Sequence, residues 1–112
     1  LVYLQTSDGR WEKTDANAAA AAAGDSRNKL GICVLAAASD GDATKVLLWG
    51  KVNAASLFPS LTIGAPVYVS ETAGEVTSTQ PTTADVVIRI IGYGNSADEL
   101  FFCPDNTWAT HV

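Results

Sequence analysis

The chain has 112 residues, of which 47% are hydrophobic and 17% charged, a balance typical of a folded domain and not of a disordered tail. Its seven Lys and Arg are outnumbered by twelve Asp and Glu, so the net charge of −5 disfavours nucleic acid as a partner. No apolar run approaches the roughly 20 residues of a membrane-spanning helix, so membrane insertion is not expected. The first residue is Leu1 and no signal segment opens the chain. We therefore expect residues 1–112 to form a single domain, or one compact end, of a longer protein.

The first third of the chain predicts a β-hairpin and a short helix. Residues 1–5 and 10–13 alternate as two strands around a turn that contains Asp8 and Gly9. The alanine run 18–23 follows a capping residue, Asp15, and ends before Gly24, which favours one or two helical turns. A helix this short is marginal by itself, because helix nucleation is costly.

The middle of the chain predicts two more strands, over residues 30–38 and 44–52, joined by the turn 39–42. Asp40 and Asp42 in this turn lack the ligand spacing of a calcium-binding loop, so an ordinary turn is the preferred interpretation. Lysines towards both ends of the second strand are typical of a sheet edge.

The stretch 61–103 reads as three consecutive strand and turn units. Residues 66–70 and 76–79 predict a hairpin with Gly74 in its turn. Residues 86–93 form the strongest strand pattern, interrupted only by Arg89, and we expect a central strand buried on both faces. Residues 99–103 predict the next strand. The fold class is therefore all-β: a small β-sandwich or barrel of seven to eight short antiparallel strands with at most one short Ala-rich helix.

The residues needed for catalysis do not come together in the sequence. The only histidine, His111, lies next to the C-terminal residue, where a rigidly held base is not expected. Three carboxylate pairs fall in or beside predicted turns, where solvated charge is the usual explanation; they are Asp40/Asp42, Glu71/Glu75 and Asp98/Glu99. We expect no enzyme, no catalytic residue, no metal site and no cofactor.

Cysteine and aromatic residues give the remaining signals. Cys33 and Cys103 are interpreted as small buried hydrophobes, with a disulfide between them left open. Tyr68 and Tyr93 are assigned to the core. Large aromatic side chains are enriched at interfaces and stack on sugar rings. The candidate interface or glycan-contact residues are therefore Trp11, Trp49 and Trp108.

A longer pattern of residues resembles a known group of proteins. The segment 64–74, GAPVYVSETAG, is followed by VIRIIGY at 87–93 and by ELFFCP at 99–104. This order resembles the small β-rich C-terminal domains of tailed-bacteriophage virion appendage proteins, such as tail fibres, tailspikes, and head-fibre or decoration proteins. In that family the position of Cys103 is often Asn, so the thiol is a departure and suggests a structural role here.

The resemblance implies a homotrimer that is made in the host cytoplasm and resides in the virion, where it contacts other virion proteins and a glycan or protein of the host surface. The first hypothesis is a non-enzymatic module at the tip of a fibre or spike, for trimer assembly or host attachment. The second is a capsid decoration or head-fibre domain. The third is a carbohydrate-binding module that uses Trp11, Trp49 or Trp108 as its platform.

Overall fold

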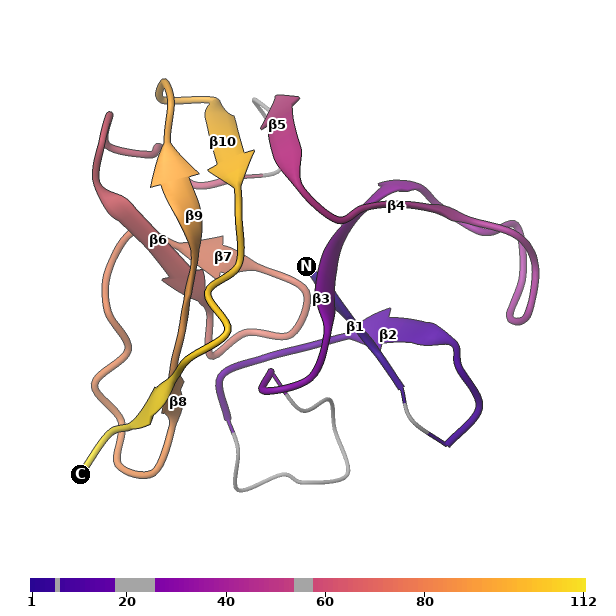
Figure 1. Ribbon diagram of the computed structural model, residues 1–112, viewed down its shortest axis with the longest axis horizontal. Coiled ribbons are helices and arrows are strands. Elements are labelled where there is room, and N and C mark those ends of the chain that lie inside the picture. Colours follow the sequence, from indigo (N-terminus) through magenta and orange to yellow (C-terminus); the bar gives the residue numbers. More distant parts are fainter. Residues whose placement is uncertain (6, 18–25, 54–57) are drawn as a thin grey trace.

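The computed structural model describes residues 1–5, 7–17, 26–53 and 58–112, and these contain eleven short strands and no helix (Figure 1). All strand pairings are antiparallel, and the strands form three sheets. The predicted all-β fold is confirmed, and the arrangement is that of a small β-sandwich. The alanine run 18–23, predicted as a short helix, lies outside the described residues.

The first sheet has the order β2-β1-β3-β4. Its strands are β1 (Val2–Leu4), β2 (Trp11–Lys13), β3 (Leu30–Leu35) and β4 (Lys45–Leu47). The predicted N-terminal hairpin is confirmed: Tyr3 lies opposite Glu12, and Gly9 in the turn has a φ of 71°, a conformation that glycine adopts readily.

The second sheet has the order β5-β10-β9-β6-β7, and a third, two-stranded sheet joins β11 to β8. The second sheet consists of β5 (Gly50–Asn53), β6 (Pro66–Val69), β7 (Val76–Thr77), β9 (Ile90–Gly94) and β10 (Glu99–Phe102), and the third of β8 (Val87–Ile88) and β11 (Ala109–Thr110). The predicted hairpin around Gly74 is confirmed as β6 and β7, with Tyr68 opposite Thr77.

The predicted strand over residues 44–52 is wrong in one respect, because the structure divides it after Leu47. The first part, β4, is an edge of the four-stranded sheet, and the second part, β5, is an edge of the five-stranded sheet. Gly50 at the division has a φ of 125°, which side chains other than glycine rarely allow. Lys45 and Lys51 therefore both lie on edge strands, as their positions predicted.

The predicted strand over residues 86–93 is also divided, at Arg89. β9 is central, between β10 and β6, as expected. The prediction that this strand is buried on both faces is wrong, because the Tyr93 side chain of β9 is 43% exposed. The register between β6 and β9 shifts so that Val67 faces Gly92 while Tyr68 faces Ile90. These two divisions, together with β11, account for the difference between eight predicted strands and the eleven observed.

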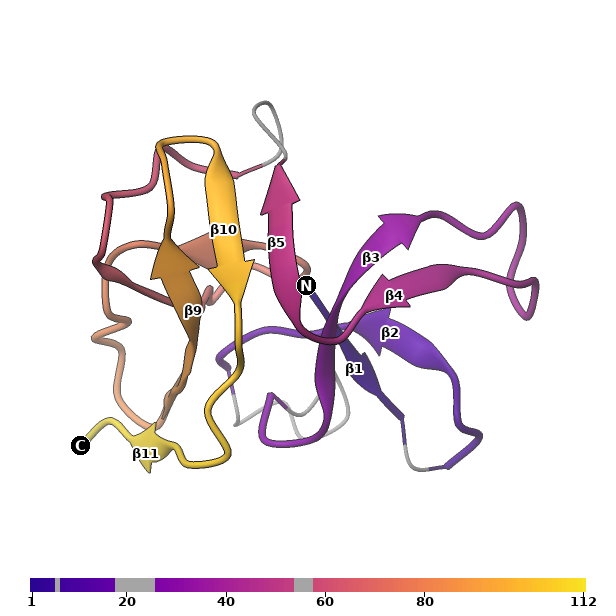
Figure 2. The ribbon, with the colours of Figure 1, turned by 45° about the horizontal axis from the view of Figure 1, so that its top comes forward.

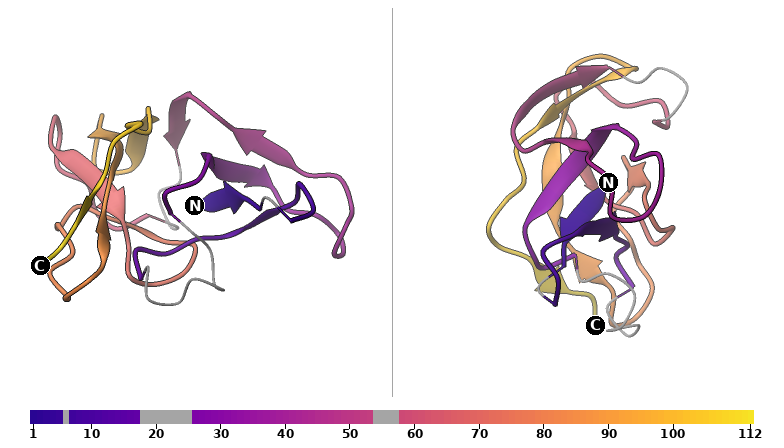
Figure 3. Two further views of the ribbon diagram at one scale, coloured as in Figure 1. Left: turned by 60° about the horizontal axis from the view of Figure 1, so that its bottom comes forward. Right: turned by 90° about the vertical axis from the view of Figure 1, so that its right-hand side faces the viewer.

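The core lies between the two larger sheets, and both contribute to one cluster of buried side chains. Figure 3 shows the sheets from two further sides. Phe102, Leu100 and Val67 of the five-stranded sheet are fully buried. Tyr3 and Leu30 bury their side chains from the four-stranded sheet, and Phe58 packs against the cluster.

The two cysteines do not behave as predicted. Cys33 is exposed, and Cys103 is half-buried. The prediction for Cys33 is wrong because burial along β3 ends at Ile32, and residues 33–35 in the outer half of the strand are all exposed. Both thiols are free, so no disulfide joins them.

Candidate functional site

The candidate site is the open face of the five-stranded sheet. Four residues form one row across neighbouring strands, because Phe101 is the Cα partner of both Lys51 and Tyr93, and Tyr93 is also the partner of Pro66. Successive strand residues point to opposite faces of a sheet. Phe102, which follows Phe101, is fully buried, so the row points away from the core.

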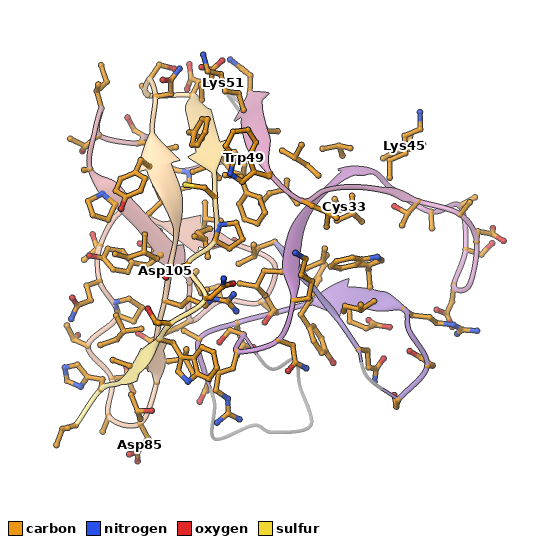
Figure 4. All side chains as sticks on the ribbon, viewed as in Figure 1. Cys33, Lys45, Trp49, Lys51, Asp85 and Asp105 are labelled. Carbon is orange, nitrogen blue, oxygen red and sulfur yellow. The ribbon has the colours of Figure 1, made fainter. Side chains whose placement is uncertain are left out.

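Trp49, which directly precedes β5, joins this row through its contact with Phe101. Its ring meets the ring of Phe101 edge to face, with centroids 5.0 Å apart and an interplanar angle of 82°. Figure 4 shows Trp49 alongside β10 and Lys51 on β5. Trp49 is 66% exposed. We call Trp49, Phe101, Tyr93 and Pro66 the aromatic face.

Tyr68 and Tyr93 were both assigned to the core from the sequence, and this assignment is wrong for Tyr93. Tyr93 is exposed because it belongs to the outward row of β9, and Tyr68 is half-buried. A run of residues that favour strands predicts a strand, but it does not predict which face of that strand packs against the core.

The rim of the aromatic face is polar. Glu99 at the start of β10 faces Asn53 of β5, and the side-chain amide of Asn95 donates a hydrogen bond to the Glu99 carboxylate. Asp98 next to Glu99 is exposed. One end of the face is therefore acidic, while Lys51 adds a positive charge along the row.

A second exposed apolar surface belongs to the four-stranded sheet. The β3–β4 hairpin extends away from the five-stranded sheet (Figure 2). Val34 and Leu35 in the outer half of β3 are 52% and 53% exposed. Lys45, the Cα partner of Leu35, is exposed beside them. We call Val34, Leu35 and Lys45 the apolar arm.

The structure does not bring the three predicted tryptophans together. Trp49 belongs to the aromatic face. Trp11 is half-buried on β2 of the other sheet, where it lines a groove. Trp108 is 47% exposed and precedes β11, at the far end of the central strand, where its ring lies 5.9 Å from the guanidinium of Arg89.

Arg89 is a structural residue whose role the sequence did not reveal. It is only 5% exposed, and its Nε donates to the carbonyl of Asp105 at 2.8 Å. Its Nη1 donates to the carbonyls of Ser26 and Asn28, each at 2.7 Å. A charged residue within a β-branched run was the available signal, since such a charge is retained in a core only where it is satisfied.

Asp40 and Asp42 of the first carboxylate pair contact polar side chains of the two hairpins. Asp40 pairs with Arg10 at 3.3 Å, and Asp42 accepts a hydrogen bond from Ser39. The described residues contain no group of three or more His, Cys, Asp or Glu side chains that could hold a metal ion. Among the same residues, no helix is long and apolar enough to cross a membrane.

One ionisable group beside the aromatic face has a shifted pKa. Partial burial and, secondarily, the negative charge of Asp105 raise the pKa of the Cys103 thiol above its usual value. Both effects disfavour the thiolate. Cys103 therefore stays in its neutral form over a wider pH range than an ordinary thiol.

Comparison with known proteins yields no relative. No protein-family model, no curated protein and no solved structure gives a significant match to this chain.

Proposed function

We propose that the chain is a non-enzymatic structural module of a phage virion, at the tip of a fibre or spike, which assembles as a homotrimer through its aromatic face. The observation that carries this proposal is the row of Trp49, Phe101, Tyr93 and Pro66 on the open side of the sheet. Large aromatic side chains dominate the energetics of protein interfaces, and contiguous exposed apolar patches on folded chains mark interaction sites.

The occupant of this face is a second copy of the chain. The described residues form an exposed apolar surface on each of the two larger sheets, the aromatic face and the apolar arm. A head-to-tail contact between unlike surfaces closes into a ring when its rotation permits, and such a ring buries both surfaces of every copy.

Charge supports the same pairing. The aromatic face is bordered by Asp98 and Glu99, whereas the apolar arm carries Lys45. Contact between the face of one copy and the arm of the next brings Lys45 towards these carboxylates. Complementary charge of this kind fixes the orientation of partners more than it adds affinity.

The test is the solution mass of the chain, by native mass spectrometry and by light scattering after size exclusion. The wild type is expected to have three times the mass of one chain. The double variant Trp49→Ser/Tyr93→Ser removes two exposed aromatic side chains without touching the core, so it is expected to be a folded monomer. Leu35→Asp on the arm is expected to give the same result.

Trp108→Ser is the matched control, because Trp108 is exposed to a similar extent as Tyr93 but lies off the aromatic face. This variant is expected to remain a trimer. A wild type that is monomeric at about 100 μM, or a double variant that stays trimeric, would contradict the assembly proposal.

Two binding assays distinguish a fibre tip from a capsid decoration domain. A fibre or spike tip binds whole host cells as a trimer, whereas a decoration or head-fibre domain binds purified capsids that lack it. Binding to capsids and not to cells would favour the capsid decoration or head-fibre domain over the fibre or spike tip.

A further inference from the structure

The four-stranded sheet carries a groove on the face that points away from the core. It lies between the β1–β2 hairpin and the β3–β4 hairpin and has a volume of about 490 Å³. Pockets for small ligands typically measure roughly 300–1,000 Å³. The groove is on a different sheet from the aromatic face, so it is a separate site.

Trp11 forms the floor of the groove. Its ring reaches across β1 to β3, where its Cζ3 atom lies 3.3 Å from the position that a Cβ on Gly31 would occupy. Gly31 has no side chain and so leaves this space to the indole. A Cβ there would also lie 2.2 Å from Cγ1 of Val46. The indole is thus supported from beneath, while the half-buried residue keeps part of its surface open to the groove.

The β3–β4 hairpin forms the opposite wall. Its register shifts between Cys33 and Leu35, and such a bulge bends a strand. The tip of the hairpin meets the other hairpin, where Nη1 of Arg10 lies 3.3 Å from Oδ2 of Asp40. Gly41 in the tip has a φ of 85°, a conformation that glycine adopts readily.

The wall presents hydrogen-bond donors and acceptors beside the aromatic floor. Ser39 donates to Asp42 at 3.1 Å, and Arg10 pairs with Asp40. An ionised carboxylate has about four acceptor positions and a guanidinium has five donors, so these pairs leave capacity for a ligand. All four side chains are exposed.

We propose that this groove binds a neutral saccharide, with one hexose or N-acetylhexosamine ring placed over Trp11. The apolar face of such a ring packs on an indole, and its hydroxyl groups suit the Asp40, Asp42 and Arg10 side chains. The two carboxylates outnumber the single guanidinium, and the chain has a net charge of −5, so acidic sugars are disfavoured. The proposal concerns a separate site and stands whether or not the aromatic face drives assembly.

The first experiment screens the folded chain against an array of neutral and acidic glycans. The strongest neutral oligosaccharide is then titrated into the variant Trp49→Phe/Trp108→Phe, in which Trp11 is the only tryptophan. Saturable change in the fluorescence of Trp11 is expected. Trp11→Ala is expected to weaken binding by about tenfold or more, measured by calorimetry, and Trp11→Phe by less.

Two further variants address the wall and the alternative site. Asp42→Asn keeps the shape of the side chain and removes its charge, so it is expected to weaken binding several-fold without lowering the melting temperature. Trp49→Ser/Tyr93→Ser is the matched control, because it changes assembly but not the groove. It is expected to leave the affinity per chain unchanged.

Several outcomes would overturn the saccharide proposal. One is an array on which no neutral glycan binds at millimolar concentration, and another is a preference for acidic glycans. Binding that survives Trp11→Ala, or that is lost in Trp49→Ser/Tyr93→Ser at equal chain concentration, would place the contact elsewhere. Because mass reports on assembly and calorimetry reports on the groove, either proposal can fail alone.

Discussion

Replacing Arg89 by methionine tests whether one buried guanidinium holds two loops of the fold together, the loop before β3 and the loop after β10. Arg89 lies where the strongest strand pattern is interrupted, and its side chain is hydrogen-bonded to the backbone carbonyls of Ser26, Asn28 and Asp105. Methionine has a similar length and no donor, so the substitution removes these bonds while it fills much of the same space.

The expected magnitude follows from the hydrogen bonds. A bond from a charged donor contributes roughly 1.5–3 kcal/mol to stability, and an acceptor left buried without a partner costs about as much. The cost of desolvating a guanidinium offsets part of this contribution. We expect Arg89→Met to lower the free energy of unfolding by about 2–4 kcal/mol, which for a domain of this size lowers the melting temperature by roughly 10–20 °C.

The assay is urea denaturation followed by tryptophan fluorescence, together with calorimetry. Arg89→Lys is expected to be nearly as destabilising, because an ammonium lacks the planar fork that reaches several acceptors. Arg10→Met is the control: the Arg10 side chain is 51% exposed, so its loss is expected to cost less than about 1 kcal/mol. If Arg89→Met cost no more than Arg10→Met, the role assigned to Arg89 would be refuted.

Three further predictions concern backbone geometry and thiol chemistry. Gly92→Ala is expected to lower the free energy of unfolding by about 1–3 kcal/mol in urea denaturation, because a Cβ there would lie 2.2 Å from the carbonyl oxygen of Phe101; a neutral effect would contradict this close approach. Asp85 has a φ of 68°, so Asp85→Ala is expected to cost about 1 kcal/mol by the same assay and Asp85→Gly almost nothing, and equal costs would argue against strain at this position. Because its pKa is raised, Cys103 holds less reactive thiolate at a given pH than an ordinary thiol does. Iodoacetamide at pH 8 is therefore expected to label the exposed Cys33 first, and the labelling rate of Cys103 is expected to keep rising above pH 9. Peptide mass spectrometry measures both rates, and faster labelling of Cys103 would contradict the shift.

The candidate sites show where sequence reasoning reached its limit. Trp11 and Trp49 were selected from residue type and strand strength, and both line exposed features of the structure. Tyr93 was missed, because its exposure depends on the single open face of the sheet. The groove was also missed, since Trp11 and Asp40 line it from two hairpins that only the tertiary structure places side by side.

The sequence by itself determined the all-β class, the two tight hairpins and the edge positions of Lys45 and Lys51. These features depend on local rules: alternation of side chains, glycine in turns, and charge on sheet edges. Only the tertiary structure decided where two long apolar runs divide, which sheet each half joins, and which face stays open. Those outcomes depend on contacts between residues far apart in the chain, such as the bonds from Arg89 to Ser26 and Asn28, and no local pattern encodes them.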